Sequence, residues 1–117
     1  NTLEAVIKEL ARTQSLVIQG RGSQFILRDY PKALHVLMTA PTEVRLKRVM
    51  ETLKLDRENA KREIARFDSG AREFIKRYFS AELEDPGHYQ IVLNTGQLSF
   101  HDAAEIILNA FGRLRRI

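Results

Sequence analysis

Three short apolar runs, separated by segments of helical periodicity, constrain the fold of this chain more than any other feature of its sequence. They are rich in strand-forming residues and cover residues 15–18, 34–38 and 89–93. The segments between them are long enough to act as crossovers, and crossover connections join parallel strands. We therefore expect an α/β fold with a parallel sheet flanked by helices. Three strands make a thin sheet, which another segment or another chain would have to complete.

The helices are predicted by the spacing of apolar residues and by their caps. Apart from a short helix from Ser23 to Leu27, with Ser23 as its N-cap, the expected helices are 3–11, 42–53, about 56–79 and 99–110. Pro41 suits a first helical position, Asp56 suits an N-cap, and Ser99 followed by Asp102 resembles a capping box. Within the third of these helices, apolar residues recur at helical spacing for about five turns: Ala60, Ile64, Phe67, Ala71, Phe74 and Tyr78.

The composition excludes several classes of protein. Apolar residues make up 44% and charged residues 29% of the 117 residues, which is ordinary for a globular domain. No apolar run approaches the roughly 20 residues of a membrane span, so we expect no membrane partner. Cysteine is absent, which excludes disulfides and thiolate sites and fits a cytoplasmic location. The three histidines are too scattered for a local metal motif, so we expect no metal site from them.

The first candidate site is Gly20-Arg21-Gly22, at the carboxyl end of the first expected strand. In open α/β sheets, ligands bind outside the carboxyl ends of the strands. Two glycines allow the backbone to approach a ligand closely, and the arginine between them can grip a phosphate. The same tripeptide also suits a tight turn from strand to helix. The residues alone leave both interpretations open.

The second candidate is the charged helix at about 56–79. Arg62, Arg66 and Lys76 lie on one face of a helical wheel, opposite the apolar stripe, and Asp68 and Arg72 lie on a neighbouring face. These cations predict either a lid that closes over a polyphosphate or a solvated face held by pairs such as Asp68 with Arg72. After the last strand, Asn94-Thr95-Gly96 favours a turn over a nucleotide contact.

An ordered set of segments resembles the cytidylate kinase-like family. The run from Val17 to Leu27 is similar to that family's Val-Ile-x-Gly-Arg-Gly-x-x-x-Ile-Leu segment. The match continues, in order, through nearly the whole chain. The other similar segments are Ala5–Ala11, His35-Val36, Ala40-Pro41-x-Glu43-x-Arg45, Asp68 with Ala71-Arg72-x-x-x-Lys76-Arg77-Tyr78-Phe79, Tyr89–Leu93, Asn94-Thr95-Gly96 and Ser99.

The resemblance implies a nucleoside monophosphate kinase-like domain over residues 1–117, with residues 56–79 as its lid. Such enzymes transfer the γ-phosphoryl group of ATP, with magnesium, to a nucleotide such as CMP. By position, Gly20, Arg21 and Gly22 would hold the phosphate of the acceptor. The resemblance further implies catalytic lid arginines at Arg72 and Arg66. It also implies substrate contacts from Asp68, Lys76 and Arg77, with Asp68 orienting the lid arginine.

The chain departs from the family pattern at three places. No Gly-x-x-x-x-Gly-Lys-[Ser/Thr] loop occurs in the 117 residues, and Gln19 and Gly22 stand where cytidylate kinases carry aspartate. We therefore interpret the chain as the later part of a three-layer P-loop kinase-like domain whose P-loop segment is missing, and we expect it to be inactive alone. The alternative is a non-catalytic regulatory module that binds a nucleotide or a protein.

The net charge of +4 suggests nucleic-acid binding only weakly. Exposed edges of an incomplete sheet predict self-association or contact with further domains of a longer chain.

Overall fold

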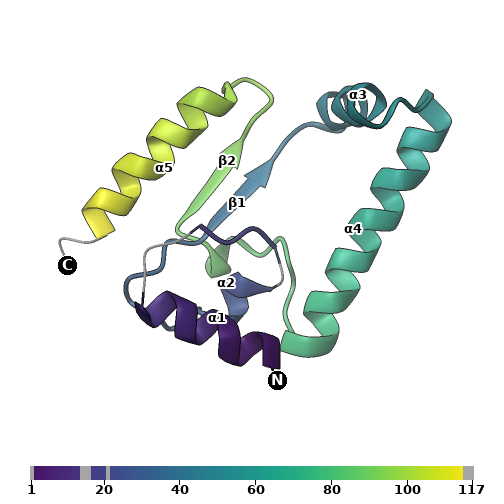
Figure 1. Ribbon diagram of the computed structural model, residues 1–117. Helices are drawn as coiled ribbons and strands as arrows, with labels where there is room; N and C mark the ends of the chain where they lie inside the picture. Colours follow the sequence, from purple (N-terminus) through teal and green to yellow (C-terminus); the bar gives the residue numbers. More distant parts are fainter. Residues whose placement is uncertain (1, 14–16, 21, 115–117) are drawn as a thin grey trace.

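The computed structural model describes residues 2–13, 17–20 and 22–114, and it places a two-stranded parallel sheet between helices (Figure 1). Helix α5 lies on one side of the sheet in this view, and the pair α3 and α4 lies on the other. The elements are α1 (Thr2–Thr13), α2 (Ser23–Ile26), β1 (Val36–Thr39), α3 (Thr42–Leu53), α4 (Arg57–Phe79), the 3-10 turn η1 (Pro86–His88), β2 (Ile91–Asn94) and α5 (Phe100–Leu114).

Strands β1 and β2 confirm the second and third expected strands. They pair in parallel, from Val36 opposite Ile91 to Thr39 opposite Asn94. The pairing continues past the carboxyl ends, where the amide of Thr95 donates to the carbonyl of Thr39 at 2.7 Å. Because the strands are parallel, both carboxyl ends lie at the same edge of the sheet.

The first expected strand is not observed where the structure can test it. Residues 15 and 16 lie outside the described residues, and Val17 and Ile18 have no regular secondary structure. The side chain of Val17 is 98% exposed, so this part of the run is not buried. An apolar run becomes a strand only where a neighbouring strand supplies hydrogen-bond partners, and β1 pairs with β2 instead. The described sheet is therefore smaller than expected.

Helices α3 and α4 pack against one another, and each contributes a buried residue to the core, Leu46 from α3 and Ala60 from α4. Asp56 caps α4 as expected, because its Oδ1 accepts from the amide of Asn59 at 2.8 Å. The helix runs through Gly70 without a break. Its apolar stripe is partly open to solvent, since Phe67 is 69% exposed.

Two helix starts differ in detail from the prediction, and a third agrees with it. Gly22, with φ of 69°, is the N-cap of α2, and the Ser23 hydroxyl donates to the carbonyl of Gly20 instead of capping. Pro41 is the N-cap of α3 and not its first residue. Before α5, the Ser99 hydroxyl accepts from the amide of Asp102 at 3.0 Å, so the hydroxyl half of the expected capping box is present.

In the part of the chain that the structure describes, no helix has both the length and the apolar character to cross a membrane.

Candidate functional site

A shallow hollow lies at the carboxyl ends of the two strands. Its walls come from the ends of both strands and from the start of α3 and α5. The residues that line it are Met38, Thr39, Ala40, Arg45, Arg48, Thr95 and Phe100. Parallel α/β sheets bind ligands at this edge, so the hollow is a candidate ligand site.

Arg48 of α3 holds Thr95, the residue that follows β2 and bonds to the end of β1. Its Nη1 donates to the Thr95 hydroxyl at 2.9 Å, and its Nη2 donates to the Thr95 carbonyl at 2.8 Å. The Thr95 hydroxyl donates in turn to the carbonyl of Thr39 at 3.0 Å. The guanidinium also lies 4.8 Å from the centre of the Phe100 ring, a cation–π contact. Thr95 itself belongs to the expected turn, in which Asn94 Oδ1 accepts from the amide of Gly96.

Arg45 of α3 and Asp68 of α4 form a bidentate ion pair that joins the two helices. The two guanidinium nitrogens of Arg45 donate to the two oxygens of Asp68, at 2.8 and 2.7 Å. These hydrogen bonds hold the pKa of the Asp68 carboxyl below its usual value and raise the pKa of Arg45. The expected pair of Asp68 with Arg72 is therefore wrong: the carboxylate faces a different helix, and tertiary packing decides its partner.

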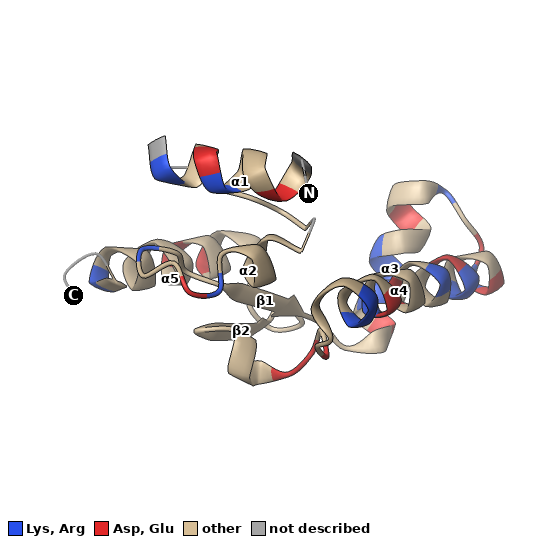
Figure 2. Cartoon of the chain, turned by 90° about the horizontal axis from the view of Figure 1, so that it is seen from below, with Lys and Arg blue, Asp and Glu red and all other residues tan. Residues whose placement is uncertain are grey.

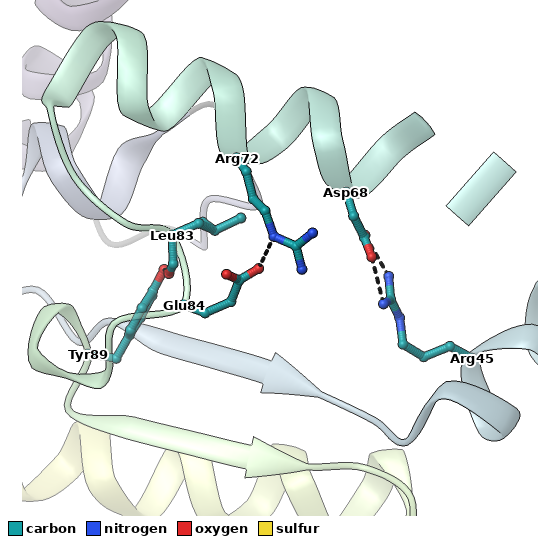
Figure 3. A network of polar contacts seen from close by, with 6 residues as sticks. All are labelled: Arg45, Asp68, Arg72, Leu83, Glu84 and Tyr89. Atoms are coloured by element: carbon teal, nitrogen blue, oxygen red, sulfur yellow. Dashed lines mark hydrogen bonds and ion pairs between the residues drawn. The ribbon is translucent and has the colours of Figure 1, made fainter. Parts of the chain in front are cut away.

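Arg72 lies on the same face of α4 as Asp68, one turn further along the helix. Its Nε donates to Glu84 at 2.7 Å, and Glu84 comes from the segment between α4 and η1. The positive charge of Arg72 also contributes to the low pKa of Asp68, after the larger effect of Arg45. Figure 3 shows the two arginines and two carboxylates together beside α4. We call Arg45, Asp68, Arg72 and Glu84 the arginine–carboxylate cluster.

The other expected lid residues are distributed around α4. Lys76 follows Arg72 by one turn on the same face and pairs with Glu82 at 2.9 Å. Arg66 pairs with Glu63 on another face, and Arg77 lines a separate open surface of α4. Basic and acidic bands alternate along the helix (Figure 2). Asp68, Arg72 and Lys76 thus follow one another at one-turn intervals on one side of α4, whereas Arg66 and Arg77 lie elsewhere. The expected grouping of Lys76 with Arg66 is corrected, because Lys76 and Arg72 both pair with the segment that follows α4.

Gly22 of the expected phosphate loop lies at the C-terminal end of α4. Arg21 lies outside the described residues, but Gly20 and Gly22 are described and have φ of 75° and 69°. The backbone of Gly22 lies so close to Phe79, the last residue of α4, that a Cβ would be 2.7 Å from its ring. Phe79 also stacks on Phe25 of α2, with 5.2 Å between ring centres. Gly22, the last residue of the expected phosphate loop, therefore packs against the C-terminal end of α4.

The described residues offer no ready-made metal site. No group of three or more His, Asp or Glu side chains in residues 2–13, 17–20 and 22–114 is placed to hold an ion. The carboxylates of the cluster, Asp68 and Glu84, are each engaged by an arginine. In this arrangement they do not fit as magnesium ligands.

The prediction from sequence did not assign roles to Arg45, Arg48, Thr95 or Glu84. Arg45 and Thr95 do lie in segments that resemble the family, so the sequence contained a motif that could have marked both residues. No local signal marks Glu84, because its partner is twelve residues away. Glu84 comes within reach of Arg72 only because the segment before β2 folds back toward α4.

A parallel strand pair with arginines gathered near its carboxyl edge is typical of the α/β proteins that bind phosphorylated ligands. The sequence profile of the cytidylate kinase-like family matches residues 1–97. The chain therefore belongs to the cytidylate kinase-like family, and the resemblance seen in its motifs is confirmed.

Several cytidylate kinases are distant relatives. That of Methanocaldococcus jannaschii is 22% identical over 110 residues, which cover 92% of this chain and 62% of the relative. That of Sulfolobus acidocaldarius is 30% identical over 80 residues, covering 68% and 44%, respectively. That of Pyrobaculum neutrophilum is 27% identical over 107 residues, covering 92% and 58%. The chain thus spans between 44% and 62% of these relatives' lengths.

A solved structure has the same fold. It is an uncharacterized protein from Eubacterium ventriosum, with a TM-score of 0.88 and 23% sequence identity. The similarity covers 93% of this chain and 69% of the other. The comparison supports the mixed α/β architecture of the chain, with its small parallel sheet and flanking helices.

Proposed function

We propose that this chain carries the acceptor-binding and lid parts of a nucleotide kinase, which transfers the γ-phosphoryl group of ATP to a nucleoside monophosphate such as CMP. The observation that carries the proposal is the pair of arginines, Arg45 and Arg72, gathered beside α4 with Arg45 at the carboxyl end of β1. Phosphoryl transfer depends mainly on positioning and on charge stabilisation, and guanidinium groups supply both.

Each element of the site has a proposed role. The loop Gly20-Arg21-Gly22 would hold the phosphate of the acceptor, with Gly22 packed against Phe79. Arg72 would contact the phosphoryl group in transfer, and Lys76, one turn away, would add charge on the same face of α4. Asp68 would be a positioning residue that orients the guanidinium of Arg45.

Arg66 and Arg77 receive a lesser role in this proposal. They project from other faces of α4 and lie apart from the cluster in this arrangement of the lid. We propose that they raise the positive potential around the site and do not contact the reacting groups there. This lesser role is supported by helix geometry, because residues six and five positions from Arg72 face away from it on a helix.

We propose further that the 117 residues do not turn over substrate on their own. ATP with magnesium would supply the phosphoryl group, and the phosphate cradle that such kinases use has no counterpart in this sequence. The preorganised donors of that cradle supply much of the charge stabilisation in the reaction. We assign the described residues the acceptor side of the reaction and no magnesium ligand.

A second candidate function is a regulatory module that binds a nucleotide or a partner protein without catalysis. It is favoured by Gln19 and Gly22, which replace aspartates of the family pattern. Gly22 also leaves no room for a side chain, because Phe79 occupies the space. The two candidates share the binding site and differ in whether transfer follows.

Calorimetric titration with CMP, AMP and ATP–magnesium tests the proposal. We expect the chain to bind one of the monophosphates, and Arg72→Ala and Arg21→Ala to weaken that binding about ten- to 100-fold, since each removes a charge-assisted hydrogen bond. The matched control is Arg57→Ala, which removes an arginine of α4 that pairs with Glu43 instead. No binding to any nucleotide would overturn the proposal, and transfer of phosphate to CMP by this chain alone would overturn its inactivity.

A further inference from the structure

We propose that Glu84 lowers the affinity of the phosphate-binding site: it pairs with Arg72 in the free protein, and an incoming phosphate group displaces it. The inference rests on the proposed function, because it takes Arg72 to be a phosphate-binding residue. It adds a residue that neither the sequence motifs nor the family resemblance marks. Three properties of the structure support it: how Glu84 is held, the charge of the cluster, and the difference between its two carboxylates.

The backbone around Glu84 is fixed on both sides. The hydroxyl of Tyr89, a largely buried residue, donates to the carbonyl of Leu83 at 2.6 Å. On the other side, the amide of Asp85 donates to the carbonyl of Glu82 at 3.2 Å and closes a turn. Figure 3 shows the result, in which Glu84 extends from this segment toward Arg72. Its contact with Arg72 therefore follows from an anchored backbone.

The arginine–carboxylate cluster is neutral as a whole. Its two arginines balance one aspartate and one glutamate, and each charge affects more than its direct partner. Arg45, for example, has its pKa raised first by Asp68 and to a lesser extent by the charge of Glu84. A neutral cluster attracts an anion weakly. When Glu84 withdraws, the cluster has a net charge of +1 and Arg72 regains free donors for phosphate oxygens.

The two carboxylates differ in how readily they can leave. Asp68 is 20% exposed and receives two hydrogen bonds from Arg45. Glu84 is 52% exposed, its partner Arg72 is 55% exposed, and one hydrogen bond joins them. Exposed ion pairs are weak because water competes for both groups. A phosphate would therefore displace Glu84 and leave Asp68 in place to hold Arg45.

The experiment compares three proteins by calorimetric titration with CMP and, separately, with inorganic phosphate, at low ionic strength. They are the unaltered chain, Glu84→Gln and the control Glu43→Gln. Glu43 also pairs with an arginine of α4, at 2.6 Å, so the control makes the same change of charge at a similar exposed pair outside the cluster. Thermal unfolding confirms that all three proteins are folded.

We expect Glu84→Gln to bind both probes about two- to fivefold more tightly than the unaltered chain, the range that an exposed ion pair can contribute. Glu43→Gln should match the unaltered chain. Equal affinities of the unaltered chain and Glu84→Gln would overturn this inference and leave the proposed function standing. An equal gain in Glu43→Gln would also overturn it, because net charge alone would then be the cause. If none of the three binds, the proposed function and this inference both fail.

Discussion

Replacing Gly22 by alanine is expected to destabilise the chain by about 2–5 kcal/mol, the sum of two separate effects. The backbone of Gly22 has φ of 69°, in the left-handed region, where a Cβ costs about 1–2 kcal/mol. The new Cβ would also lie 2.7 Å from Cε2 of Phe79 and 3.3 Å from Cε1 of Phe74. Relieving such overpacking typically costs a further 1–3 kcal/mol or so.

Gly20 provides a matched control two residues away. Its φ is 75°, so alanine meets the same backbone penalty, but a Cβ there has no atom within 4 Å. Gly20→Ala should therefore lose only about 1–2 kcal/mol. The difference between the two variants isolates the contact between the glycine loop and the end of α4.

Urea unfolding followed by circular dichroism measures both variants. In a Phe79→Leu background the ring is gone, and the difference between Gly22→Ala and Gly20→Ala should shrink. Equal losses for the two alanine variants in the natural background would refute the reasoning. The glycine loop would then not rest on Phe79, and the proposed link between acceptor loop and lid would lose its structural basis.

Three further predictions concern the caps, the charges and the surface. Asp56→Ala should lower the free energy of unfolding by about 1 kcal/mol because the amide of Asn59 loses its acceptor, whereas Asp56→Asn should retain most of it in urea unfolding. Arg45 lowers the pKa of Asp68 in the folded state. The ion pair therefore stabilises the fold fully above the pKa that Asp68 has in the unfolded chain, about 4, and this stabilisation is lost as the pH falls through its lower pKa in the folded chain. The stability gap between the natural chain and Asp68→Asn should therefore be widest near neutral pH and close in acid; a gap constant from neutral pH into acid would contradict this. The exposed ring of Phe67 and the incomplete sheet predict self-association, seen as a mass that rises with concentration in sedimentation equilibrium, and a monomer at every concentration would contradict it.

Much of the local structure could be predicted from the sequence. The helices around 3–11, 42–53 and 56–79, the N-cap at Asp56 and the turn at Asn94 all follow from signals confined to a few neighbouring residues. The parallel pairing of β1 and β2 could also be predicted, because a long helical crossover is the connection that joins parallel strands. Membership of the cytidylate kinase-like family was likewise visible in the order of the motifs.

The sequence by itself thus determined the main helices, two of the three expected strands, the caps at Asp56 and Ser99, and the family. Tertiary structure alone decided which elements and charges meet. Asp68 pairs with Arg45, 23 positions away, and not with Arg72 one turn along its own helix. Val17 is exposed although its run has the composition of a buried strand. The physical reason is range: a cap or a turn depends on neighbours along the backbone, whereas an ion pair between helices or a strand in a sheet exists only where the folded chain brings its partner within reach.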